Sequence, residues 1–202
     1  MHYLGIVKKR RHEFILFVAI FVYTLIFSYF TCLKHDSFSS FAWDLGVFNQ
    51  VFYSSTHGGR LFYYTADLYM NESGNYLAMH FSPIIGLLFP LYYLFPSVYL
   101  LLVAKSSLIA LASYPLFKIA KELTGNSGAG LLVGLAYLLN PGVQGVNWFD
   151  FQPQVFVPLL VFATYYMLIK KNWKFYFSFL MLSLTIEEHI FSILILLLLS
   201  HF

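Results

Sequence analysis

Long apolar runs, separated by short polar or basic stretches, dominate the chain. The first run covers residues 14–33 and would form a helix of roughly 30 Å, which matches the hydrocarbon core of a bilayer. Further apolar runs lie at residues 97–117, 128–143 and 153–169, and each is followed by lysines or by a proline turn. We therefore predict transmembrane helices at these four places.

The last apolar stretch, residues 175–202, is interrupted by Glu187, Glu188 and His189. It forms either two short helices, the fifth and sixth, or one long helix of roughly 42 Å. A single helix would hold the three polar residues near the middle of the membrane, whereas a broken helix would place them at a cavity that opens outward. Together the runs predict an all-α, polytopic integral membrane protein with about six transmembrane helices.

A long polar stretch at residues 34–96 separates the first two spans, and we expect it to form a large extracytoplasmic loop. Within it, residues 44–54 carry apolar side chains on one helical face and polar ones, including Gln50, on the other. This pattern is typical of a helix on a membrane surface. Residues 81–95 are apolar, but they contain prolines and would reach only about 22 Å, so we predict a juxtamembrane or re-entrant segment.

Basic residues indicate the orientation, because short loops rich in Lys and Arg stay in the cytoplasm. The basic clusters lie at residues 8–11, at Lys118 and Lys121, and at Lys170, Lys171 and Lys174. They share one side of the membrane only if residues 81–95 do not cross it. We therefore predict a multi-pass protein of the cell membrane with residues 1–13 in the cytoplasm.

The composition supports a membrane environment. Hydrophobic residues make up 59% of the chain and charged residues 10%, whereas soluble proteins have about 25% charged residues. The net charge of +3 comes mostly from the short basic clusters and gives no sign of a nucleic-acid partner. A single cysteine, Cys32, excludes an intrachain disulfide and a cysteine-rich metal site. Aromatic residues, 21% of the chain, could stack on sugars, but interfacial aromatic belts give a simpler explanation of Trp43, Tyr63, Tyr64, Tyr92 and Tyr93.

Acids are scarce, so their positions carry information. Asp44 begins the predicted surface helix, where it acts either as an N-cap or as a general base at the boundary between water and lipid. Asp150 lies in a short outer loop before the fourth span, as an ordinary loop acid or as a site residue. Glu187 and Glu188 form a turn between half-helices or line a cavity, because ionisable residues in apolar segments usually serve a function.

Two basic side chains are further candidates. Lys105 lies about eight residues into the second span, where it could snorkel to the interface, pair with an acid or hold a lipid phosphate. His80 could contact a metal or a phosphate, although a lone histidine more often does neither. The sequence has no metal-binding His or Glu pair, phosphate loop, nucleophile elbow or zinc-type cysteine spacing, so the metal remains unknown.

Four motifs occur in order along the chain: WDLGVFNQ at residues 43–50, HFSPI at 80–84, FDFQPQ at 149–154 and EEH at 187–189. They resemble a family of predicted prokaryotic membrane proteins, the domain-of-unknown-function family twenty seventy-nine. The resemblance covers nearly the whole chain. That family is distantly similar to the GT-C membrane glycosyltransferases, which use polyprenyl-phosphate-linked sugars as donors.

The resemblance implies a GT-C-like N-terminal module in which an acid of the first outer loop is the catalytic base or a metal ligand. Asp44 matches this position, Asp150 matches an acid of the second outer loop, and Glu188 falls near a charged position after the fourth span. A polyprenyl-phosphate lipid and a divalent metal become candidate ligands. The expected substrate-binding residues are Gln50, His80, Lys105, Gln154, Glu187 and His189.

The chain also departs from the family. Its EEH motif stands where a basic residue followed by two acids is usual, and Gln152-Pro153 stands where His-Pro is common. Family members are usually longer, so we expect this chain to be truncated relative to them: it is a fragment, a split gene product, or one half of a complex with a second membrane subunit. The alternative to an enzyme is a non-enzymatic transport, lipid-handling or scaffold subunit, with Lys105 and residues 187–189 lining a polar pathway.

Overall fold

The computed structural model describes residues 2–188 and residue 190, and this part of the chain is helical apart from its loops and one isolated bridge. The α-helices are α1 (His2–Asp36), α2 (Val47–Thr56), α3 (Phe89–Leu94), α4 (Val98–Leu111), α5 (Ser113–Thr124), α6 (Ser127–Leu138), α7 (Pro141–Trp148), α8 (Val157–Ile169) and α9 (Trp173–Leu184). Shorter helical turns are η1 (Ala42–Gly46), η2 (Tyr76–Ala78), η3 (Pro83–Leu88) and η4 (Pro153–Phe156). The all-α prediction is confirmed for this part.

Two helices in the described part are long and apolar enough to cross a membrane. One is Arg11–Asp36 within α1, and the other is Val98–Thr124, which joins α4 and α5. The pair α6 and α7 is a third candidate, with a bend of 45° between the two helices. The segment Pro153–Ile169 is apolar but shorter. Two or three membrane spans are thus supported, and about six remains a prediction.

Prolines account for the breaks in these helices. Pro115 has no backbone N–H, so the carbonyl of Leu111 lacks its usual helical partner, and α4 ends there. Pro141 is the first residue of α7, where a proline is tolerated. The side-chain Oδ1 of Asn140 accepts hydrogen bonds from the N–H groups of Gly142 at 2.8 Å and Val143 at 3.3 Å. The sequence therefore starts a new helix at the bend.

Two glycines let α6 pack closely against α5 and α1. A Cβ atom at Gly130 would lie 2.8 Å from the carbonyl oxygen of Phe117, and one at Gly134 would lie 2.9 Å from Cδ1 of Leu16. Small residues allow the same close backbone approach between helices in membranes. Larger side chains at these positions would push the helices apart.

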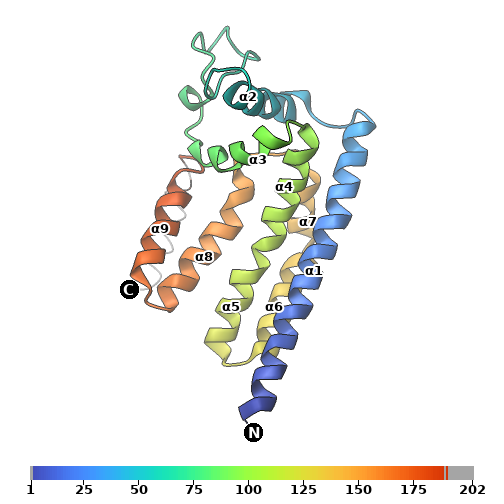
Figure 1. Ribbon diagram of the computed structural model, residues 1–202, viewed down its shortest axis with the longest axis vertical. Helices are drawn as coiled ribbons and strands as arrows, with labels where there is room; N and C mark the ends of the chain where they lie inside the picture. The colour runs from blue at the N-terminus through green and yellow to red at the C-terminus, as the bar shows by residue number, and fades with distance from the viewer. Residues whose placement is uncertain (1, 189, 191–202) are drawn as a thin grey trace.

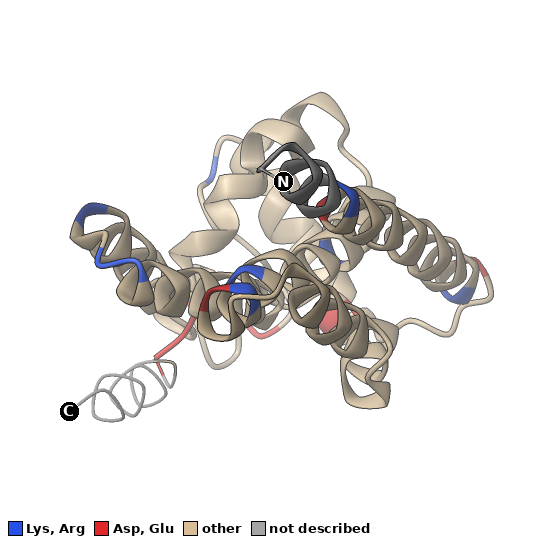
Figure 2. Cartoon of the chain, turned by 90° about the horizontal axis from the view of Figure 1, so that it is seen from below, with Lys and Arg blue, Asp and Glu red and all other residues tan. Residues whose placement is uncertain are grey.

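Ion pairs join several helices at the end of the molecule where the chain begins (Figure 1). Glu13 of α1 accepts hydrogen bonds from Lys118 at 2.8 Å and Lys121 at 2.9 Å. Lys170, after α8, lies 3.0 Å from Glu122 of α5. Viewed from this end, Lys and Arg positions lie on several of the helix ends (Figure 2). We call this the basic end.

Helices α2 and α3 lie across the opposite end of the bundle (Figure 1). The apolar face of α2 is buried there, and the ring of Phe52 packs against Phe89, Tyr92 and Phe151 at centroid distances of 5.2, 5.3 and 5.8 Å. This face of the predicted surface helix therefore packs against protein. The long loop between α2 and η3 covers the same end, which we call the loop end.

Candidate functional site

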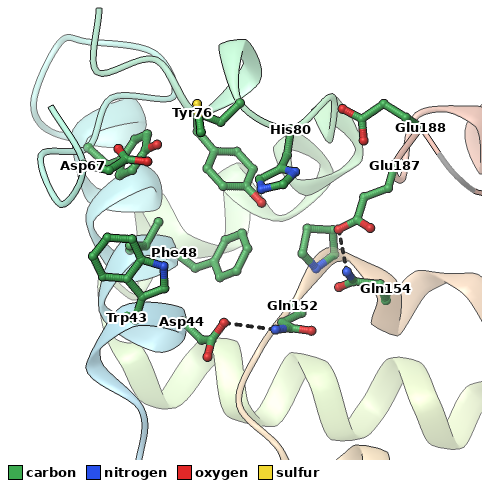
Figure 3. A pocket seen from close by; sticks show the side chains of 14 residues that line it. Trp43, Asp44, Phe48, Asp67, Tyr76, His80, Gln152, Gln154, Glu187 and Glu188 are labelled. Atoms are coloured by element: carbon green, nitrogen blue, oxygen red, sulfur yellow. Dashed lines mark hydrogen bonds between the residues drawn. The ribbon is translucent and has the colours of Figure 1, made fainter. Parts of the chain in front are cut away.

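A cavity of about 440 Å³ lies at the loop end, and we call it the acidic cavity. Its walls come from four stretches of the described chain: residues 43–48, 64–80, 152–154 and 187–188. Figure 3 shows side chains from all four stretches converging on it. Residues that are far apart in the sequence therefore share one hollow.

Asp44 lies in η1, the turn that leads into α2, and lines the acidic cavity. The interpretation of Asp44 as an N-cap is wrong, because the N-caps of η1 and α2 are Phe41 and Gly46 and neither cap has a side-chain hydrogen bond. The Asp44 carboxylate instead accepts a hydrogen bond at 3.0 Å from Nε2 of Gln152 (Figure 3). This contact orients the carboxylate at the cavity wall.

Glu187 and Glu188 follow the end of α9 at Leu184 and line the same cavity. Glu187 is only 7% exposed and accepts a hydrogen bond at 2.6 Å from Nε2 of Gln154. Glu188 accepts one at 2.8 Å from the backbone N–H of Phe81, next to His80, which also lines the cavity. The predicted site residue His189 lies outside the described residues.

Sequence reasoning missed the wall formed by the loop after α2. Asp67 and Tyr64 line the cavity and are 6% and 3% exposed, so assigning Tyr64 to an interfacial belt is wrong. Tyr76 projects into the cavity beside His80 (Figure 3). Burial, and then the charge of Glu187, raises the pKa of the Tyr76 phenol above its ordinary value. Burial and the neighbouring Asp67 likewise raise the pKa of Tyr64.

A second space, an apolar groove of about 430 Å³, lies near the same end of the bundle and shares one lining residue with the acidic cavity. It lies between α6, α7 and α8, with a lining of mainly apolar side chains such as Tyr137, Val161 and Phe162. Gln154 lines both the groove and the cavity. Its Nε2 binds Glu187, while its buried Oε1 has no hydrogen-bond partner among the described residues. One residue therefore contributes to the walls of both spaces.

A family described as "Predicted membrane protein (DUF2079)" matches residues 34–201 of the chain. The chain belongs to this family. Searches among curated proteins and among solved structures found no match. The DUF2079 description states no activity, so the arrangement of the residues has to indicate the function.

The motifs of this DUF2079 protein contribute to one site. The first supplies Asp44, the second His80, the third Gln152 and Gln154, and the fourth Glu187 and Glu188 to the lining of the acidic cavity (Figure 3). The sequence suggested that these motifs belong together, and the structure places them around one space.

Other predicted site residues of the DUF2079 chain do not line the acidic cavity. Asp150 is 3% exposed; it lies 3.3 Å from Nζ of Lys34 and accepts a hydrogen bond at 2.6 Å from the N–H of Phe41. Lys105 is fully buried and donates to the carbonyl of Phe149, so it does not snorkel. Gln50 donates at 3.0 Å to the hydroxyl of Thr65.

Among the residues that the structure describes, no three His, Cys, Asp or Glu side chains are grouped so that they could hold a metal ion. The carboxylates of the cavity are spread around its walls instead (Figure 3).

Proposed function

We propose that this DUF2079 protein is a GT-C-like glycosyltransferase, or the N-terminal module of one, that uses a polyprenyl-phosphate-linked sugar. The observation that carries the proposal is that the acidic cavity and the apolar groove share Gln154 as a lining residue. A lipid-linked sugar has one polar and one apolar part. The sugar occupies the cavity, and the first isoprene units lie in the groove.

Asp44 is the catalytic base in this proposal. Its Oδ1 is bound by Gln152, and its second oxygen takes the proton from the acceptor hydroxyl. The hydroxyl oxygen forms a bond to the anomeric carbon as the bond from that carbon to the phosphate oxygen breaks. The products are the glycosylated acceptor and the polyprenyl phosphate, and the proton passes from Asp44 to water. General base catalysis of this kind contributes roughly 10²–10⁴-fold to a rate.

Other cavity residues bind and orient the substrate. His80 is placed to contact the phosphate, because no Lys or Arg in the described part of the chain lines the cavity. Glu187, Glu188 and Gln154 hold the sugar or acceptor hydroxyls by hydrogen bonds. Asp150 and Lys105 position the segment before η4, because their partners are Lys34 and the Phe149 carbonyl.

The orientation follows from the charges at the two ends. The basic end carries the ion-paired lysines of α5 and the one after α8, and such clusters stay in the cytoplasm. The protein then has its N-terminus inside, crosses the cell membrane several times, and opens the acidic cavity at the outer face.

The test is transfer of labelled sugar from a polyprenyl-phosphate hexose by the full chain in lipid bilayers. Asp44→Asn should reduce transfer by about 100-fold or more while leaving the helical content unchanged. The matched control is Asp36→Asn, because Asp36 is exposed and binds Tyr99 outside the cavity. Full transfer by Asp44→Asn, or equal loss in both variants, would refute the role of Asp44.

A lipid-handling protein without chemistry would use the same cavity and groove. Such a protein would bind the lipid-linked sugar equally well before and after Asp44→Asn and would release no polyprenyl phosphate. The transport alternative required Lys105 and residues 187–189 to line one pathway, but Lys105 is bound to the Phe149 carbonyl instead.

A further inference from the structure

A third space, of about 670 Å³, lies between α1 and α7 near the loop end, and we call it the α1–α7 groove. The two helices contact each other, and α7 lies beside α1 in Figure 1. The lining of the groove is mainly apolar, with Phe30 and Leu33 from α1 and Gly145 and Trp148 from α7. Among the described residues, none lines both this groove and the acidic cavity.

Lys34 places a positive charge at the end of the α1–α7 groove that lies nearest the loops. Its side chain is 10% exposed, and its Nζ lies 3.2 Å from the carbonyl oxygen of Trp148 and 3.3 Å from Oδ1 of Asp150. An ammonium group has three N–H donors, and the described part of the chain offers Lys34 these two acceptors. One donor therefore remains for a ligand in the groove.

The charges around Lys34 do not balance. Lys105 is fully buried and lies close enough to interact electrostatically with Lys34 and Asp150. Asp150 is the one acid that forms an ion pair with either lysine within the described residues. Two lysines and one aspartate leave a net positive charge when all three are ionised. A buried charge without a counter-ion is costly, so an anion in the groove would be favourable.

The depth of the groove indicates which anion fits. The apolar span in α1 ends at Asp36, so Lys34 lies at the boundary between the hydrocarbon core and the lipid headgroups. Phe30 and Leu33 lie about one turn or less further into the span and are 46% and 49% exposed. The groove thus offers a cation at headgroup depth and an apolar wall just below it.

We propose that the α1–α7 groove binds an anionic glycerophospholipid of the leaflet at the loop end. The phosphate accepts a hydrogen bond from Nζ of Lys34, and one acyl chain lies against Phe30 and Leu33. A zwitterionic lipid fits less well, because the nearby Asp150 is 3% exposed and is already bound by Lys34 and the N–H of Phe41, so it does not attract an amine. This site does not rest on the proposed glycosyltransferase function.

The test measures which lipid lies against Trp148 in the full chain, with Trp43 and Trp173 replaced by phenylalanine. The protein is placed in bilayers of phosphatidylcholine that contain increasing amounts of a lipid with brominated acyl chains, which quench tryptophan fluorescence on contact. We expect brominated phosphatidylglycerol to bind about fivefold more tightly at Trp148 than brominated phosphatidylcholine. Equal binding of the two lipids would overturn the proposal. Displacement of phosphatidylglycerol by excess inorganic phosphate would indicate a site for a free anion and would also overturn it.

One pair of variants tests the charge. Lys34→Gln should remove the preference for phosphatidylglycerol at Trp148, whereas Lys174→Gln should keep it. Lys174 is exposed at the start of α9, far along the chain from the groove, so the two variants change the total charge equally. An equal loss of preference in both variants would indicate attraction by the total charge and contradict a site at Lys34.

A second pair tests the groove and leaves the ion pair of Lys34 intact. A Cβ at Gly145 would have no atom within 4 Å, so a side chain added there enters the groove without a clash at its Cβ. Gly145→Phe should fill the groove and abolish the preference for phosphatidylglycerol, whereas Gly145→Ala is too small to do so and should keep it. A full preference in Gly145→Phe would refute binding between α1 and α7.

Discussion

Replacing Asp150 with asparagine removes one charge from the interior and keeps the size of the side chain. Oδ1 of Asp150 lies 3.3 Å from Nζ of Lys34, and the two side chains are 2% and 10% exposed. At this distance, an effective dielectric constant of 20 gives an attraction of about 5 kcal/mol. Asparagine can still accept from the N–H of Phe41, and Lys34 keeps a contact at 3.2 Å with the carbonyl of Trp148. We therefore expect a net loss of about 3 kcal/mol in the free energy of unfolding, at the low end for a broken buried pair.

The assay is reversible unfolding of the purified chain in mixed micelles with increasing dodecyl sulfate. Asp36→Asn is the control, because the same chemical change there affects an exposed carboxylate and should cost less than about 1 kcal/mol. Adding Lys34→Met to Asp150→Asn should cost less than the sum of the single changes, because both remove the same pair. If Asp150→Asn is as stable as Asp36→Asn, the ion pair between Asp150 and Lys34 does not stabilise the segment between α7 and η4.

Two further predictions concern packing and orientation. Gly130→Ala should destabilise the protein by about 1–3 kcal/mol, because its Cβ would lie 2.8 Å from a carbonyl oxygen of α5. Gly145→Ala is the control and should leave the stability unchanged, because no atom lies within 4 Å of a Cβ there. Unfolding in mixed micelles measures both variants, and equal stability would refute the close contact at Gly130. The orientation is tested with single-cysteine variants at Glu72, in the loop after α2, and at Thr124, at the basic end, with Cys32 replaced by serine. A membrane-impermeant thiol reagent should label the cysteine at position 72 in intact cells. It should label the cysteine at position 124 only after permeabilisation. The reverse pattern would overturn the orientation.

Composition and hydrophobic pattern predicted the helical class well, because apolar runs and prolines act locally. Pro141 lies near the end of the third predicted run, residues 128–143, and starts α7 in the structure. The motifs around Asp44 and Glu188 also named residues that line one cavity in the structure, and their role in a reaction stays a prediction. In each case the information lies within a few neighbouring residues.

Long-range partners could not be predicted in the same way. Asp150 has the sequence signature of any loop acid, and its partner Lys34 lies 116 residues away at the end of α1. Asp67 was one of several acids in a polar loop, and no spacing rule shows which of them turns inward. The wall formed by Tyr64 and Asp67 depends on how the loop folds back, for which the Tyr63–Asn75 bridge is one of the contacts.

The division of the acidic cavity among four stretches of chain has a consequence for biogenesis. Membrane proteins are inserted segment by segment as they are synthesised, and the stretch with Glu187 and Glu188 emerges more than a hundred residues after Asp44. Until then the aspartates at residues 44 and 67 have no facing glutamates, so an early intermediate has an incomplete cavity wall. The walls of the acidic cavity are therefore complete only after the segment that follows α9 has reached the loop end.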